Sequence, residues 1–403
     1  MKFNKWTLTL AAAGVVSLGS VAQGEEAKNQ VLTALSSTTL SGYVDTSAIW
    51  KLGTGNTFMP GRAYDGTAKQ DGFNLDVIKL TLEKPLDEGQ WAAGYKVDLL
   101  FGPDANYFKT FNSAGGGSDF AIQQAYVNLR APVGNGLDFK MGVFDSIIGY
   151  ESFDSYKNPN FSRSYGYSIT PRTHTGLLAT YQVAEWMSLM AGVADTTFGG
   201  INDRPWRPTG PAKESEKTYM AGLVLTAPES FGALKGAALY AGVVNGLNGL
   251  TSGMISPTDI TAWYAGVSIP TPLTGLSVGA SYNYTGNTEN YLSQSFYANA
   301  SAFYLTYQAT EKLKLNNRLE YATAGGPIAI FGSPAVTSEK FLGETFTVDY
   351  ALWANVTTRA EFRWDHDLNG SPNSFGSPKT GFGAIGARDK NALSLALNVI
   401  YKF

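Results

Sequence analysis

The sequence VTTRAEFRWD, from Val356 to Asp365, decides the fold. One parity of this segment is mostly apolar and reads Val356, Thr358, Ala360, Phe362 and Trp364. The other parity begins at Thr357 and continues with four charges in a row, Arg359, Glu361, Arg363 and Asp365. Successive side chains of an extended strand point to opposite faces, so the segment predicts a strand with one apolar and one charged face. Such a strand lies between an apolar phase and water.

The end of the chain repeats this alternation. One parity of residues 393–403 reads Leu393, Leu395, Leu397, Val399, Tyr401 and Phe403. The opposite parity includes Ala392, Ser394, Asn398 and Lys402. A strand of this length with an aromatic carboxy-terminus resembles the closing strand of a bacterial outer-membrane barrel.

The amino-terminus has the features of a secretory signal. Lys2 and Lys5 precede an apolar run at residues 8–18, and Ser20-Val21-Ala22 offers small residues for cleavage. The run is too short to span a bilayer, since about 20 apolar residues are needed. We therefore predict a signal peptide over 1–22, a short periplasmic lead-in over 23–37 and an outer-membrane β-barrel over 38–403.

Composition narrows the class of protein. The chain has no cysteine, which excludes disulfides, thiolate nucleophiles and cysteine-ligated metals. No long apolar stretch follows the signal, so helical membrane spans are excluded, whereas in a barrel only alternate residues meet lipid. The chain has 30 basic and 33 acidic residues. Removal of Lys2 and Lys5 with the signal peptide gives the mature chain a net charge of about −5. Nucleic acid is therefore not expected as a partner, because no basic field attracts phosphate.

Alternating segments bounded by turn residues predict sixteen strands. They lie near residues 38–52, 72–84, 91–101, 119–131, 137–150, 172–183, 186–197, 216–227, 234–245, 260–269, 276–286, 295–309, 312–323, 341–351, 356–366 and 390–403. The links alternate between short turns, as at 132–136 and 310–311, and long loops, as at 53–71 and 367–389. Outer-membrane barrels sort their connections in this way, with the short turns periplasmic. The fold predicted is an all-β, antiparallel transmembrane barrel.

Tryptophans support the same fold. Trp91, Trp186 and Trp353 fall on the short-turn side, whereas Trp50, Trp263 and Trp364 fall near the long loops. Amphipathic rings collect at both membrane interfaces. The alternative is core tryptophan in a soluble β protein.

The third long loop carries the residues that could select solutes. It runs GYESF from Gly149, continues through NPNFSRSYGY to Tyr167, and leads to PRTHTG at residues 171–176. This run resembles the signature of the uncharacterised putative β-barrel porin family. In general porins, which the barrel as a whole resembles, the third loop folds inward and narrows the pore. The loop differs from the acidic motif of those porins, so their residues cannot be transferred one for one.

The chemistry of this loop suits a pore constriction. It offers carboxylates, cations and an imidazole: Glu151, Asp154, Lys157, Arg163, Arg172 and His174. Opposed charges across a narrow aqueous gap create a transverse field that favours polar solutes. The alternative is an ordinary surface loop with solvated charges.

Parity also predicts the wall of the lumen. If the more apolar parity faces lipid, the lumen receives Lys96, Asp98, Arg130, Lys140, Arg318, Glu320, Asp349, Arg359, Glu361 and Arg363. A mid-strand Arg or Lys facing lipid would cost about 2–4 kcal/mol. One arc of the wall contains Arg318, Arg359 and Arg363. These arginines either face the folded loop or only pair with charges on neighbouring strands.

Two other motifs are weaker. Asp365-His366-Asp367-Leu368-Asn369-Gly370 begins like a calcium loop, but Gly376 stands where a bidentate Glu is expected. An outer-membrane hydrolase would need an imidazole base, and neither His174 nor His366 accompanies a nucleophile motif.

The sequence therefore predicts a porin for passive diffusion of small hydrophilic solutes and ions, with outer-membrane lipid as its surroundings, no cofactor, no metal and no catalytic activity. The alternative is a sugar-selective porin, in which loop tyrosines would stack on sugar rings: Tyr150, Tyr156, Tyr165 and Tyr167. Resemblance to general porins implies a homotrimer.

Overall fold

The computed structural model describes residues 31–32, 37–52, 69–108, 118–205, 215–249, 258–287, 295–325, 338–369 and 390–403. The predicted signal peptide over 1–22 lies outside these residues, as do most of the lead-in and the end of the calcium-like motif at Gly370 and Gly376. Val31–Leu32 of the lead-in form a short strand, β1, that pairs antiparallel with the start of the first long strand.

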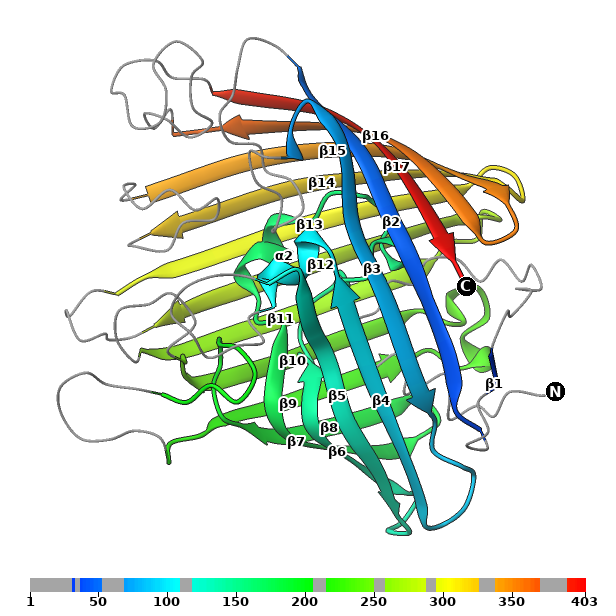
Figure 1. The fold of residues 1–403 in the computed structure, drawn as a ribbon, viewed down its shortest axis with the longest axis vertical. Coiled ribbons are helices and arrows are strands. Elements are labelled where there is room, and N and C mark those ends of the chain that lie inside the picture. Colours follow the sequence, from blue (N-terminus) through cyan, green and yellow to red (C-terminus); the bar gives the residue numbers. More distant parts are fainter. Residues whose placement is uncertain are drawn as a thin grey trace.

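Sixteen antiparallel strands form a closed barrel, as predicted (Figure 1). They are β2 (Thr39–Leu52), β3 (Gly72–Lys84), β4 (Ala92–Phe101), β5 (Phe120–Ala131), β6 (Leu137–Asp145), β7 (Thr173–Ala184), β8 (Met187–Ala194), β9 (Thr218–Thr226), β10 (Ala238–Leu247), β11 (Asp259–Pro270), β12 (Leu276–Asn287), β13 (Tyr297–Gln308), β14 (Leu313–Gly325), β15 (Ser338–Trp353), β16 (Val356–Asp367) and β17 (Asn391–Lys402). Each pairs with its neighbour in the sequence, and β17 pairs with β2 to close the ring.

Closure removes the sheet edges, which matters because an unpaired backbone amide or carbonyl in lipid costs several kcal/mol. The terminal Phe403 extends the seam. Its backbone NH donates to the Gly42 carbonyl at 3.0 Å, and the Gly42 NH donates to the Phe403 carbonyl at 2.9 Å. A side chain on Gly42 would collide with the Phe403 ring and with the Lys79 backbone. Glycine at this position therefore lets the carboxy-terminus lie flat against β2.

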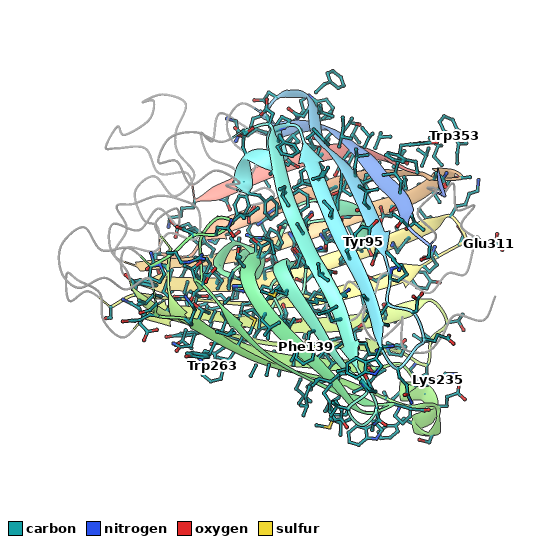
Figure 2. All side chains as sticks on the ribbon, turned by 60° about the horizontal axis from the view of Figure 1, so that its bottom comes forward. Tyr95, Phe139, Lys235, Trp263, Glu311 and Trp353 are labelled. Atoms are coloured by element: carbon teal, nitrogen blue, oxygen red, sulfur yellow. The ribbon has the colours of Figure 1, made fainter. Side chains whose placement is uncertain are left out.

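The links alternate in length around the ring. Seven are short and fall at one end, called the turn end: 85–91, 132–136, 185–186, 227–237, 271–275, 309–312 and 354–355. The other eight fall at the opposite end, called the loop end, and most of them are longer, although the links 248–258 and 288–296 are no longer than 227–237. Figure 2 shows Lys235, Glu311 and Trp353 at the turn end and Trp263 towards the loop end. Exposed tryptophan rings therefore occur near both ends of the barrel, as the sequence predicted.

Two predicted strands differ from those observed by four or more residues at one end. The fifth, predicted over 137–150, ends at Asp145, because the Ser146 NH bonds to the Arg172 carbonyl at 2.7 Å and Gly149 adopts a φ of 130°. The ninth, predicted over 234–245, begins at Ala238, since a short helix, η4 (Glu229–Leu234), occupies the preceding link. Both differences arise where apolar residues continue the alternating pattern into a loop.

The two faces of the wall differ as the alternation predicts. On β16, Ala360 and Phe362 are exposed on the outer face, whereas Arg359, Glu361 and Arg363 are buried on the inner face. No described helix is long and apolar enough to cross a bilayer.

Candidate functional site

The link between β6 and β7, residues 146–172, lies inside the barrel and is called the inner loop. It contains a short helix η3 (Ser155–Lys157) and one helical turn, α2 (Tyr165–Ile169). Figure 1 shows α2 between the strands of the near wall and those of the far wall. Most of its side chains are buried, although links of this length normally lie on the surface.

The first part of the inner loop packs against an apolar region of the wall. Ile147, Ile148 and Tyr150 contact a buried cluster contributed largely by β7–β11, which includes Leu178, Met190, Met220, Val224, Val244 and Tyr264. The Tyr150 ring also stacks on Tyr304 of β13, with ring centroids 4.3 Å apart. One side of the lumen is therefore filled with packed side chains.

The helical turn α2 lies directly on β12. The Ser164 hydroxyl caps it by accepting a bond from the Tyr167 NH at 3.1 Å. The Asn283 amide donates to the Thr170 hydroxyl at 2.9 Å, and the Thr285 hydroxyl donates to the Ile169 carbonyl at 2.7 Å. A Cβ on Gly166 would lie 2.4 Å from the Asn283 amide oxygen, so only glycine allows this close approach.

Arg318 of β14 anchors the middle of the inner loop. Its Nε donates to Glu320 on the same strand at 2.6 Å, and Nη1 donates to Glu151 of the loop at 3.0 Å. Nη1 also reaches the Ser162 carbonyl at 2.7 Å. The Arg318 side chain has no exposed surface, so these charge-assisted bonds form away from water.

Arg359 and Arg363 of β16 anchor the loop on either side of Glu361. Arg359 pairs with Asp349 of β15 at 2.5 Å and donates to the Ser155 carbonyl at 2.8 Å. Arg363 pairs with Asp365 and donates to the Arg163 carbonyl at 2.7 Å. Within the predicted arc, the Arg359–Asp349 pair crosses between strands, whereas Arg318 and Arg363 pair most closely with carboxylates of their own strands. All three arginines also contact the loop.

Carboxylates of the wall bind backbone amides of the loop. Glu361 accepts from the Phe161 NH at 2.6 Å and from the Ser162 NH at 2.9 Å, and Glu320 accepts from the Tyr165 NH at 2.7 Å. These bonds satisfy amides that neither a helix nor a strand satisfies.

Asp154 ties the inner loop to the opposite wall. Its carboxylate accepts from Lys79 of β3 at 2.8 Å and from the Tyr43 hydroxyl of β2 at 3.2 Å, and it pairs with Lys157 at 2.8 Å. Burial alone would raise the pKa of Asp154, but the Lys157 and Lys79 ammonium groups outweigh burial and hold this pKa well below its usual 3.8. The loop is thus tied to β2 and β3 as well as to β12–β16.

The remaining predicted loop residues lie in different surroundings. Arg163 is buried and donates to the carbonyls of Phe161 and Phe153. Arg172 stacks on Tyr167, with its guanidinium carbon 3.2 Å from the ring centroid. His174 is buried at the base of the loop, within 3.0 Å of the Ser146 hydroxyl. The sixth predicted loop residue, Lys157, differs from these, because 40% of its side-chain surface is exposed.

Two of the four loop tyrosines are unavailable to a solute. Tyr165 and Tyr167 are buried, and the Tyr165 hydroxyl donates to Asp365 at 2.6 Å. Tyr150 and Tyr156 are partly exposed.

The other predicted wall residues all lie on the inner face. Asp98 pairs with Lys79 at 3.1 Å, and Arg130 pairs with Asp138 at 2.6 Å near the turn end. Lys96 lies 3.5 Å from Glu83. Lys140 lies over the Tyr126 ring, 5.1 Å from its centroid.

Several residues of the site were not among the predicted site residues. Lys79 and Tyr304 bind the loop, and Lys314 and Lys402 line the lumen near the turn end. Lys79 shares the parity of Thr81 and Glu83 in a predicted strand, so the alternation could have identified it. The tyrosine shows no comparable signal, because its hydroxyl meets Glu151 only in the folded barrel.

The calcium-like motif does not form a metal site in the described part of the chain. There, no group of three or more His, Asp or Glu side chains is arranged to hold a metal. Asp365 pairs with Arg363, and Asp367 accepts from the Asn369 NH at 2.8 Å.

Comparison with known proteins gives one family and several solved folds. Residues 37–403 match the model of the BBP2 family, described as "Putative beta-barrel porin-2, OmpL-like". No curated protein matches the sequence.

Three solved structures illustrate the fold. The anion-selective porin from Comamonas acidovorans aligns with a TM-score of 0.59 and 13% identity, covering 91% of this chain and 99% of that one. The outer-membrane channel DcaP of Acinetobacter baumannii aligns with a TM-score of 0.58 and 12% identity, covering 91% and 97%. OmpT of Vibrio cholerae in its trimer form aligns with a TM-score of 0.52 and 15% identity, covering 91% and 99%. At these identities the likeness concerns the fold.

Proposed function

Because the chain belongs to the BBP2 family of β-barrel porins, we propose that it is a passive diffusion channel for small hydrophilic solutes and ions. The protein lies in the bacterial outer membrane, surrounded by lipid on its apolar face. Solutes would cross by diffusion along the lumen, without a cofactor and without energy coupling. In the usual orientation of such barrels the turn end faces the periplasm.

The fixed inner loop is the main support for this proposal. It fills one side of the lumen with Ile147, Ile148 and Tyr150, and it is tied across the lumen by Glu151 and Asp154. A loop held in this way narrows the passage permanently, so it would set the size limit for solutes.

Within this constriction we assign two roles to the predicted residues. Glu151, Asp154, Arg163, Arg318, Arg359, Glu361 and Arg363 would hold the loop in place, because they are buried and bonded to it or within it. Lys157 would line the passage, since its side chain is partly exposed. Charges that line the passage act on solutes, whereas the buried ones act on the loop.

A general channel is favoured over a sugar-selective one. Burial of Tyr165 and Tyr167 removes two of the four rings that would form an aromatic track.

We also propose no catalytic role, because the family is one of porins and His174 is buried between Ser146 and the Thr196 carbonyl. A homotrimer is proposed by analogy with similar barrels, since OmpT, an outer membrane protein of Vibrio cholerae, has a trimer form. Native mass spectrometry in detergent would test it.

Single-channel recording in planar bilayers tests the proposal. We expect stepwise conductance from the purified protein, and swelling of proteoliposomes that falls as the sugar probe grows larger. Flux that rises linearly with sugar concentration supports a general channel, and saturable flux of one sugar supports the selective alternative. A folded protein that produces no conductance steps would contradict the proposed function.

A further inference from the structure

Five lysines line the half of the lumen near the turn end. They are called the inner lysines: Lys96, Lys140, Lys157, Lys314 and Lys402. Lys96, Lys140 and Lys314 lie near the turn-end starts of β4, β6 and β14, and Lys402 ends β17. Lys157 of the inner loop faces the same region, because its ammonium group and that of Lys402 both lie over the ring of Tyr156.

The charges buried around the inner loop contribute little net field. Arg163, Arg318 and Arg363 lie among the carboxylates of Glu151, Glu320, Glu361 and Asp365, so the two signs nearly cancel. The excess carboxylate charge is bonded to backbone amides of Phe161, Ser162, Ser164 and Tyr165. Solutes in the lumen would therefore sense mainly the partly exposed groups.

Two carboxylates near the inner lysines are shared with a buried cation outside this group. Asp154 is 5% exposed and is shared by Lys79 and Lys157. Asp349 is 5% exposed and is held by Arg359 at 2.5 Å, whereas Lys314 lies 3.5 Å away. Glu83 is the carboxylate that remains well exposed beside Lys96.

Lys140 adds a positive charge on which the carboxylates of Asp145, Glu83 and Asp138 act from beyond ion-pair distance. Within the described ranges it forms no ion pair, and its Nζ lies over the face of Tyr126. Lys96 stands opposite Tyr126 in the register of β4 and β5, and its charge acts on Lys140, so the two ammonium groups belong to one region of the lumen.

Two more ammonium groups lie near the ring of Tyr156. Its ring centroid lies 5.7 Å from the Lys157 Nζ and 5.3 Å from the Lys402 Nζ. The two nitrogens are therefore at most about 11 Å apart, so an ion beside the ring can lie within one Debye length of both, about 8 Å at physiological salt. Charges at this spacing act together on an ion between them.

We propose that the inner lysines make the channel prefer small hydrophilic anions over cations, and that divalent anions are attracted more strongly than monovalent ones. This inference rests on the proposed channel function. The low-dielectric barrel wall focuses the field of the inner lysines along the lumen, which raises the local concentration of anions. A larger charge on the solute increases the attraction in proportion.

Reversal potentials under a potassium chloride gradient around 0.1 M test the proposal. We expect chloride to be at least about threefold more permeant than potassium, since surface potentials in such clefts reach several kT. The preference should shrink near 1 M salt, where the Debye length is about 3 Å. Inorganic phosphate added to the chloride solution should reduce the chloride current more than an equal concentration of nitrate.

Charge-removing variants assign the preference to the inner lysines. Lys140→Gln should lower the chloride-to-potassium ratio, and the triple variant Lys140→Gln, Lys314→Gln, Lys402→Gln should lower it at least about twofold. Lys235→Gln is the matched control, because Lys235 lies at the turn end in a link outside the lumen and pairs with Glu229 (Figure 2). The control should keep the wild-type ratio.

The outcomes separate the two proposals. A channel that conducts without preference, or prefers potassium, refutes the anion preference and leaves the porin function in place. An anion preference that persists in the triple variant refutes the assignment to the inner lysines. A folded protein that forms no channel refutes both proposals.

Discussion

Replacing Arg318 by methionine should loosen the inner loop while the barrel stays closed. The side chain donates to Glu320, to Glu151 and to the Ser162 carbonyl, and none of it is exposed. Methionine fills a similar length but offers no donor. The variant therefore leaves Glu151 and Glu320 buried without their guanidinium partner.

The size of the effect follows from that burial. Removing one partner of a buried ion pair costs about 3–5 kcal/mol, because the remaining charge is uncompensated. Each 1.4 kcal/mol is a factor of about ten, so a loss of about 3 kcal/mol multiplies the ratio of displaced to seated loop by about 100. The sixteen-stranded backbone pairing does not depend on this side chain, so the cost falls mainly on the loop.

Single-channel recording should detect the change. We expect Arg318→Met to show a higher mean conductance, or added open-channel noise, than the wild type. The double variant with Glu151→Gln should recover part of the wild-type behaviour, because neutralising Glu151 removes one of the two stranded charges.

Arg130→Met provides a matched control. Like Arg318, Arg130 pairs with a carboxylate, but its partner is Asp138 of the wall, at 2.6 Å near the turn end. Its removal should leave the conductance noise unchanged. If a folded Arg318→Met channel records identically to the wild type, then Arg318 does not hold the constriction and the reasoning from burial is wrong.

Three further predictions concern other parts of the molecule. Gly166→Ala places a Cβ 2.4 Å from the Asn283 amide oxygen and should weaken the seating of α2 by about 1–3 kcal/mol, seen as faster hydrogen exchange in residues 165–169; unchanged exchange would contradict it. Phe362→Arg places a charge on the exposed outer face and should destabilise the barrel by about 2–4 kcal/mol in denaturant titrations from lipid vesicles, while Phe362→Leu should cost much less. The pKa of Asp154 is lowered, so its ion pairs stabilise the seated loop at every pH above the ordinary pKa of 3.8 and are lost only as the pH falls through the lowered value. Conductance noise should therefore stay constant from about pH 7 to about pH 4. A transition near pH 5 would contradict the role of Asp154 in holding the loop.

Local patterns were sufficient to predict the barrel. The alternation in residues 356–365 recurs along the chain, and a period of two in sequence directly assigns each residue to one face of a strand. Link lengths are also local, so sixteen strands and the two kinds of connection could be predicted without any tertiary information. The prediction was wrong at strand ends such as residues 146–150, where apolar side chains pack on the interior of the barrel and not on lipid.

The site depended on contacts between residues far apart in the chain. Arg318 meets Glu151 and Lys79 meets Asp154 only after the ring closes and the inner loop enters it. A count of charges suggests a balanced lumen, but folding buries most of the paired charges and leaves lysines partly exposed near the turn end. The sequence by itself determined which residues face inward, because strand parity is a local property. The tertiary structure alone decided which of those residues are neutralised and which face the passage, because pairing and burial depend on distances that sequence spacing does not encode.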